Sequence, residues 1–123
     1  MKNKSKAIEE WENFILEPNF GDNDMVKHHI DMVNKCIEIT RAKNHDYAGD
    51  EDPLRNFRMC EQFGVSMEKG ILIRLTDKLS RIARLLDNPA YVKDESIEDT
   101  LIDTVNYSMI LDYAIKQKNE EKQ

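Results

Sequence analysis

Apolar residues recur at intervals of three and four along most of the chain, and no segment alternates apolar and polar positions as a strand would. This periodicity predicts an all-α fold, a helical bundle of about five helices that forms a single domain over residues 1–123. A first helix is expected within residues 1–20, where Ile8, Trp11 and Ile15 share one face.

Capping residues and helix breakers set the expected limits of the later segments, with a helical core over residues 24–117. A helix is expected over 24–43, capped by Asn23 or Asp22, and a polar loop over 44–52. A short helix over 53–64, capped by Asp52, and a long helix over 67–87, capped by Ser66, should follow. The last helix is expected over 96–117, with a frayed tail over 118–123.

The two longest helices differ in how their apolar residues are distributed. The apolar residues of the helix over 67–87 form one stripe. The apolar residues of the helix over 96–117 surround most of its circumference, and Tyr107, Leu111 and Ala114 lie away from the expected core side. Burial on two sides predicts a homodimer or higher homo-oligomer; the alternative is that the helix containing Trp11 covers the extra face. The expected core residues are Met67, Ile71, Leu75, Leu79, Ile82 and Leu86 on the first helix and Leu101, Ile102, Val105 and Met109 on the second.

A formal net charge of -6 narrows the choice of partners. Duplex nucleic acid and anionic membranes require a net basic face, so neither is expected as the main partner. No apolar run approaches the ~20 residues of a membrane span, and no signal core follows the N-terminus, so we expect a cytoplasmic protein. A local cluster of Arg and Lys could still bind a small anion.

Two polar stripes follow the edges of the two longest helices. The stripes consist of Arg74, Lys78 and Arg81 on the first helix and of Asp99, Asp103 and Asn106 on the second. They could face each other as an interhelical salt-bridge ladder, and Asp99 could form a capping box with Ser96. Alternatively, the cations hold phosphate oxygens while Asp99 and Asp103 hold Mg²⁺, with Asp77 and Glu95 completing the metal site.

The segment from residue 43 to residue 58 is a second candidate site. It combines cations, amides and aromatic rings within a short span, and these groups together suit a nucleobase and its phosphates. Phe57 fits the core better than it fits a ligand contact. The candidate binding residues of this segment are Lys43, Asp46, Tyr47, Arg55 and Asn56.

Several ordered motifs together resemble one known family. The motifs are Lys43-x-x-Asp46-Tyr47, Asn56-Phe57, Arg74-x-x-Asp77-Lys78-x-x-Arg81 and Glu95-Ser96-x-x-Asp99-x-x-x-Asp103-x-x-Asn106-Tyr107. Over roughly residues 40–115 they resemble the nucleotide modification associated domain, type 1, of phages and bacteria. That resemblance implies a helical fold and a role in phage nucleotide metabolism or DNA base modification.

The chain is more remotely similar to the all-α NTP pyrophosphatases of the MazG type, in which acidic residues on two adjacent helices bind Mg²⁺ and a nucleoside triphosphate. Those enzymes carry ExxE on one helix and ExxD on the next, whereas this sequence has Arg74-x-x-Asp77 and Thr100-x-x-Asp103. Two carboxylates are therefore missing, so the similarity implies ligand binding more strongly than catalysis.

Three functions remain open from the sequence. The first is a nucleotide-binding protein that acts as a Mg²⁺-dependent pyrophosphohydrolase, with Asp99 and Asp103 holding the metal that activates water. The second is a non-catalytic sponge, a phage anti-defence protein that sequesters a host immune signalling nucleotide. The third is a structural helical adaptor, for which the salt-bridge ladder is sufficient.

Overall fold

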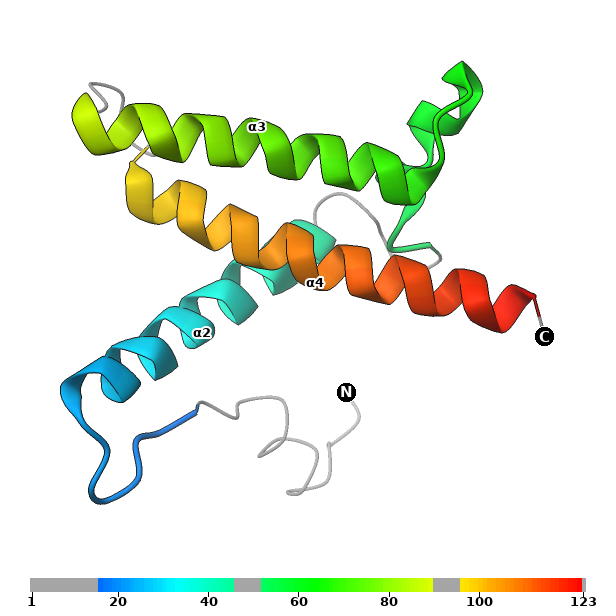
Figure 1. The fold of residues 1–123 in the computed structure, drawn as a ribbon. Coiled ribbons are helices and arrows are strands. Elements are labelled where there is room, and N and C mark those ends of the chain that lie inside the picture. The colour runs from blue at the N-terminus through cyan, green and yellow to red at the C-terminus, as the bar shows by residue number, and fades with distance from the viewer. Residues whose placement is uncertain (1–15, 46–51, 90–95, 123) are drawn as a thin grey trace. The chain divides into compact units, whose positions relative to one another are not determined.

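The computed structural model describes residues 16–45, 52–89 and 96–122, which form helices and no strand (Figure 1). The α-helices are α2 (Asp24–Lys43), α3 (Met67–Asp87) and α4 (Ile97–Glu121), and two short 3-10 helices, η2 (Arg55–Phe57) and η3 (Met59–Phe63), precede α3. The all-α prediction is confirmed, while the helix expected around Trp11 lies outside the described residues. None of the helices in the described ranges is long and apolar enough to cross a membrane.

The chain divides into two compact units, residues 1–35 and residues 36–123. In the first unit, the side chain of Asn23 accepts a hydrogen bond from a backbone amide in the first turn of α2, so it caps the helix as expected. The Asn34 side chain accepts from the Leu16 amide at 3.1 Å and donates to the Leu16 carbonyl at 2.9 Å. These two bonds attach the chain that precedes α2 to the helix itself.

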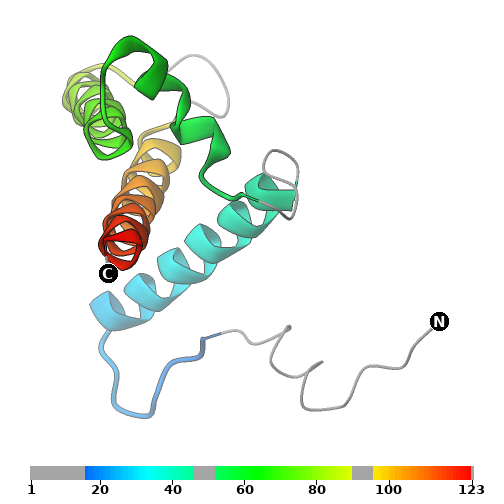
Figure 2. The same ribbon diagram turned by 90° about the vertical axis from the view of Figure 1, so that its right-hand side faces the viewer.

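The second unit is built on the antiparallel hairpin of α3 and α4, which lie side by side in both views (Figures 1 and 2). Ile71 of α3 and Ala114 of α4 are both 0% exposed. With Leu54 and Met67 they form one buried cluster, against which Phe57 and other partly buried residues pack. The small side chain of Ala114 favours a short distance between the helices, because that distance depends on the side chains at the contact.

The expected core face of α4 is correct at Ile102, which is 2% exposed, but wrong at its other three residues. Tyr107, Leu111 and Ala114, expected on a different side, are the residues that pack on the core cluster. Because α4 is apolar around most of its circumference, periodicity alone does not identify the face that meets α3. The expected core residues that are instead exposed are Leu79 and Leu86 on α3 and Leu101, Val105 and Met109 on α4.

Serine residues cap both helices of the hairpin, as the sequence predicts. The Ser66 hydroxyl accepts from a backbone amide of α3, and Ser96 forms a capping box with Asp99 at the start of α4. The end of α4 is not frayed at residue 118, because the helix continues to Glu121. Lys118 Nζ lies 2.9 Å from Glu68 Oε2 of α3, and the hydrogen bond to that carboxylate raises the pKa of Lys118.

The single short helix expected over residues 53–64 is replaced by η2 and η3. Asp52 Oδ1 accepts from the Leu54 amide at 3.0 Å, and Oδ2 lies 3.0 Å from Arg58 Nε. The Asp52 side chain therefore stabilises a local turn, and the chain continues with 3-10 geometry. Gly64 ends the segment with φ at 81°, in the left-handed region that favours glycine.

Gly70 allows η3 to pack closely against α3. A Cβ atom at this position would lie 2.5 Å from Cys60 Sγ. The thiol itself is held beside two backbone carbonyl oxygens, 3.4 Å from that of Phe57 and 3.5 Å from that of Ser66. The Cys60 thiol can therefore occupy this position only if residue 70 has no side chain.

The variant Gly70→Ala is expected to lower the free energy of unfolding by about 1–3 kcal/mol, the usual cost of overpacking, although alanine favours a helix more than glycine does. In Cys60→Ala/Gly70→Ala the added methyl group occupies the space that the thiol leaves, so most of the loss should be recovered. Urea unfolding followed by circular dichroism measures both effects. A Gly70→Ala variant as stable as the parent would contradict this account of the contact.

Candidate functional site

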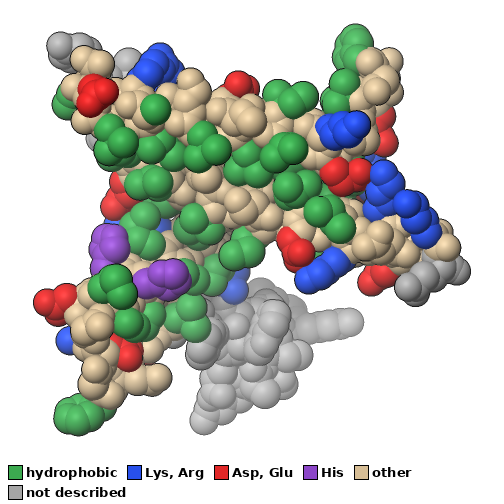
Figure 3. All heavy atoms as spheres, viewed as in Figure 1, with side chains coloured by type: hydrophobic (Ala, Val, Ile, Leu, Met, Phe, Trp, Pro, Cys, Tyr) green, Lys and Arg blue, Asp and Glu red, His purple; other side chains and the backbone are tan. Residues whose placement is uncertain are grey.

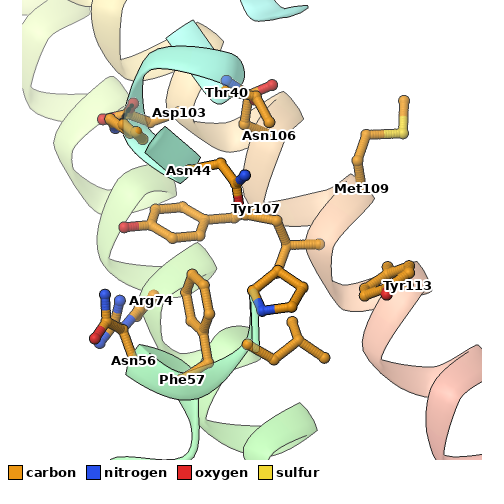
Figure 4. A pocket seen from close by; sticks show the side chains of 14 residues that line it. Thr40, Asn44, Asn56, Phe57, Arg74, Asp103, Asn106, Tyr107, Met109 and Tyr113 are labelled. Atoms are coloured by element: carbon orange, nitrogen blue, oxygen red, sulfur yellow. Dashed lines mark hydrogen bonds and ion pairs between the residues drawn. The ribbon is translucent and has the colours of Figure 1, made fainter. Parts of the chain in front are cut away.

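A cavity of about 640 Å³ lies within the second unit, between the end of α2, the segment around η2 and one side of α4 (Figure 4). Its lining combines aromatic and aliphatic side chains with a few polar and charged groups, which is typical of small-molecule sites. The lining residues are Thr40, Lys43, Asn44, Pro53, Leu54, Asn56, Phe57, Arg74, Asp103, Asn106, Tyr107, Met109, Ile110 and Tyr113.

Two aromatic rings with cations above them form one wall of the cavity. Phe57 and Tyr107 meet edge to face, with ring centroids 6.1 Å apart and planes at 88°. The guanidinium carbon of Arg74 lies 4.9 Å from the centroid of Phe57, and Lys78 Nζ lies 5.8 Å from that of Tyr107. Figure 4 shows the two rings side by side. Phe57 is thus partly buried against the core, as predicted, and also lines the cavity.

Asp103 pairs with two lysines that come from two other helices. Its Oδ1 lies 3.3 Å from Lys43 Nζ, and its Oδ2 lies 3.0 Å from Lys78 Nζ. The Asp103 side chain is 24% exposed and that of Lys78 27% exposed, so both groups are partly screened by solvent. The structure therefore brings these three predicted residues together, and the pair between α3 and α4 corresponds to one step of the salt-bridge ladder.

Arg81 and Asn106 both contact groups of the protein itself. Arg81 Nε donates to Thr100 Oγ1 at 3.2 Å, and Arg81 is not among the described residues that line the cavity. Asn106 lines the cavity, and its Nδ2 donates to the Cys36 carbonyl at 3.2 Å. This bond attaches the last turns of α2 to α4. Burial raises the pKa of the Cys36 thiol, which disfavours a reactive thiolate at this junction.

Of the four carboxylates expected to bind Mg²⁺, the structure describes Asp77, Asp99 and Asp103. Asp103 is paired with two ammonium groups, Asp99 accepts from the backbone and the hydroxyl of Ser96, and Asp77 is exposed. Glu95 lies outside the described residues. Over residues 16–45, 52–89 and 96–122, no group of three or more His, Cys, Asp or Glu side chains is arranged to hold a metal ion. Asp99 therefore completes the helix cap, and Asp103 pairs with the lysines.

The residues predicted between positions 43 and 58 are not all part of the cavity. Lys43 and Asn56 line it, whereas Arg55 is exposed and outside the lining. Asp46 and Tyr47 lie outside the described residues. Of the predicted binding residues, the structure therefore gathers Lys43, Asn56, Arg74, Lys78 and Asn106 around one cavity or its aromatic wall.

The apolar part of the cavity is not apparent from the motifs. Met109, Ile110 and Tyr113 line it from α4. The signal that could have identified them is the surplus of apolar residues on α4, which exceeds the need of a single core face. Thr40 and Asn44 give no such signal, because they are ordinary polar residues at the end of a helix that tertiary packing brings to the site.

Comparisons with known proteins bear on the same region. A family model described as nucleotide modification associated domain 1 matches residues 43–112, which is more than half of the chain. The match includes Phe57 and Tyr107 of the cavity wall and the charged residues Lys43, Arg74, Lys78 and Asp103 around it. No curated protein and no solved structure matches the chain. The resemblance indicated by the sequence motifs is confirmed: the chain belongs to the nucleotide modification associated domain 1 family.

Proposed function

We propose that the chain binds a nucleotide in the cavity beside Phe57 and Tyr107 and retains it without cleaving it. The observation that carries the proposal is the pair of aromatic rings, each with a cation above its face, at the wall of a cavity of about 640 Å³. A nucleotide combines a flat aromatic base with phosphates, so it matches both kinds of group at once. Membership of a nucleotide-associated family supports the same ligand class.

In this proposal the two parts of the ligand contact different parts of the lining. The base lies against the aromatic and apolar residues, which include Tyr107 and Met109, and the amide of Asn56 can hydrogen-bond to its edge. The phosphates lie toward Lys43, Arg74 and Lys78, whose nitrogen atoms provide charge-assisted hydrogen bonds. Arginine suits this role because its planar group donates two parallel bonds.

Retention is favoured over hydrolysis by the state of the acidic residues. A Mg²⁺-dependent hydrolase requires carboxylates that face a metal and its water. Asp103 instead neutralises two lysines, and Asp99 completes a helix cap. The structural adaptor accounts for these pairs equally well, but it gives no role to a cavity with an aromatic and cationic wall.

Arg74→Ala and Lys78→Ala are each expected to weaken nucleotide binding about 10- to 100-fold, the range that corresponds to losing a hydrogen bond to a charged group. The affinity of the parent should also fall with added salt. The affinity of each variant should fall less steeply, because each variant has lost one contact to a phosphate. Isothermal titration calorimetry at several salt concentrations measures both quantities.

Arg84→Ala is the matched control, because Arg84 is an exposed cation of the same helix that does not line the cavity. Its affinity should equal that of the parent. If Arg74→Ala and Lys78→Ala also bind as the parent does, the phosphates do not lie where we propose.

Asp103→Asn distinguishes a carboxylate that competes with phosphate from one that holds a metal. We expect tighter nucleotide binding, by about fivefold or 1 kcal/mol, because a negative charge near the phosphates is removed while the shape is kept. The free energy of unfolding should change by less than about 1 kcal/mol, since the pairs are partly exposed.

Asp112→Asn is the matched control. Asp112 lies on an exposed part of α4, where its Oδ2 is 2.9 Å from Lys116 Nζ. It should leave nucleotide affinity unchanged. Loss of Mg²⁺-dependent binding in Asp103→Asn would instead assign Asp103 to a metal and restore the hydrolase hypothesis.

Incubation of the protein with a panel of linear and cyclic nucleotides and Mg²⁺, followed by filtration and chromatography, tests retention directly. We expect at least one nucleotide to be retained and recovered intact after release by denaturation. Recovery of a cleaved product would contradict retention without hydrolysis, and failure to retain any nucleotide would favour the adaptor.

A further inference from the structure

The aromatic and apolar lining of the cavity extends beyond the two rings that meet edge to face. Phe57 and Tyr107 form what we call the first wall, and Met109 and Tyr113, which also line the cavity, form the second wall. Figure 4 shows Met109 and Tyr113 apart from the two rings of the first wall. In the described part of the chain, neither residue of the second wall belongs to the core cluster or to the partly buried residues that pack against it.

Helix geometry separates the two walls on α4. Met109 and Tyr113 are four positions apart, so their side chains share one side of the helix. Tyr107 lies about a third of a turn away from them around the helix axis. Side chains that point in such different directions do not face each other, so one flat ring cannot stack on both Tyr107 and Tyr113. A base that lies on the first wall therefore leaves the second wall open.

Exposure alone does not make the second wall a contact surface. Met109 is 67% exposed and Tyr113 45% exposed. Apolar side chains are exposed elsewhere too, and Figure 3 shows them along both helices of the hairpin. Met109 and Tyr113 differ because they line a cavity of about 640 Å³ together with the first wall. An aromatic ring and a polarisable thioether both make favourable contacts with flat rings.

The charges around the cavity indicate how much phosphate the ligand carries. Lys43 and Arg74 line the cavity, and Lys78 lies above the ring of Tyr107. The carboxylate of Asp103 offsets one of these three cations, so about two net positive charges remain for a ligand to balance. A phosphomonoester carries about two negative charges near neutral pH, and so does a pair of phosphodiesters. A nucleoside triphosphate carries more charge than these groups balance.

We propose that the ligand is a dinucleotide, with one base on each wall and its phosphates toward Lys43, Arg74 and Lys78. The proposal rests on the function proposed above, because it concerns the same cavity. A mononucleotide balances the charge but covers one wall, and a triphosphate adds charge without adding a ring. A dinucleotide adds the second ring at the same charge. Thr40 and Asn44, which line the cavity at the end of α2, offer hydrogen-bonding groups to the edge of a base.

Ligands of equal charge and different numbers of bases test the proposal. AMP, diadenosine diphosphate and cyclic di-AMP each carry about two negative charges, but AMP has a single base. Isothermal titration calorimetry should give at least one dinucleotide an affinity about 5- to 100-fold higher than that of AMP, which corresponds to one more base stacked on an aromatic ring. The guanine counterparts are titrated in parallel, so that a base preference does not hide the effect. The dinucleotide that binds more tightly identifies the linkage.

Variants of the second wall show whether Tyr113 provides this advantage. In Tyr113→Ala the advantage of the dinucleotide over the mononucleotide should fall to about twofold or less, because the ring is lost. Tyr113→Phe keeps the ring and should keep the advantage. Ile115→Ala is the matched control and should also keep it, since Ile115 is 42% exposed on the same helix and is not among the described residues that line the cavity. Circular dichroism establishes that each variant keeps its helices, and Met109→Ala replaces Tyr113→Ala if the latter does not fold.

The outcomes separate this proposal from the one on which it rests. If the mononucleotides bind at least as tightly as the dinucleotides in both the adenine and the guanine series, the dinucleotide is overturned and nucleotide binding stands. An advantage that persists undiminished in Tyr113→Ala also overturns the assignment of a base to the second wall. If neither mononucleotides nor dinucleotides bind, both proposals are overturned.

Discussion

The buried cluster that contains Ile71 of α3 and Ala114 of α4 fixes the orientation of the rest of the second unit. Both side chains are fully buried between α3 and α4, and a helix can rotate little about its axis once such a contact has formed. With Ala114 directed at α3, Tyr107 is directed at Phe57 and the cavity wall. The same rotation exposes Leu101 and Ile115 on the other side. One buried cluster thus determines which side of α4 lines the cavity and which side is exposed.

The site depends on this packing because its members are far apart in the sequence. Lys43 and Asp103 are separated by sixty positions, and Phe57 meets a ring fifty residues later. None of these pairs can exist in the unfolded chain, so a ligand that contacts them binds the folded form alone. Binding therefore adds to the stability of the fold in proportion to the logarithm of ligand concentration.

Local features of this fold could be predicted, and features that depend on tertiary packing could not. Ser66 and Ser96 were identifiable as caps because a cap is a contact between residues three apart. The core face of α4 was not identifiable, because three sides of that helix carry apolar residues and only the position of α3 selects one. The 3-10 geometry after Asp52 follows from a turn in which the Asp52 side chain accepts the Leu54 amide, and this turn competes with an α-helix. A polar residue before a proline is compatible with either structure, so the sequence does not decide between them.

If the cavity binds a nucleotide as we propose, Asp103 gives it a form of selectivity that its size alone would not provide. In the ligand-free protein this carboxylate lies between Lys43 and Lys78, so the lysine charges are already compensated by an anion that is covalently part of the chain. A free inorganic anion brings only charge and competes with a tethered group whose effective concentration is high. A ligand that also carries a flat aromatic part gains contacts that the carboxylate does not make. On this proposal, the cavity discriminates against the abundant small anions of a cell.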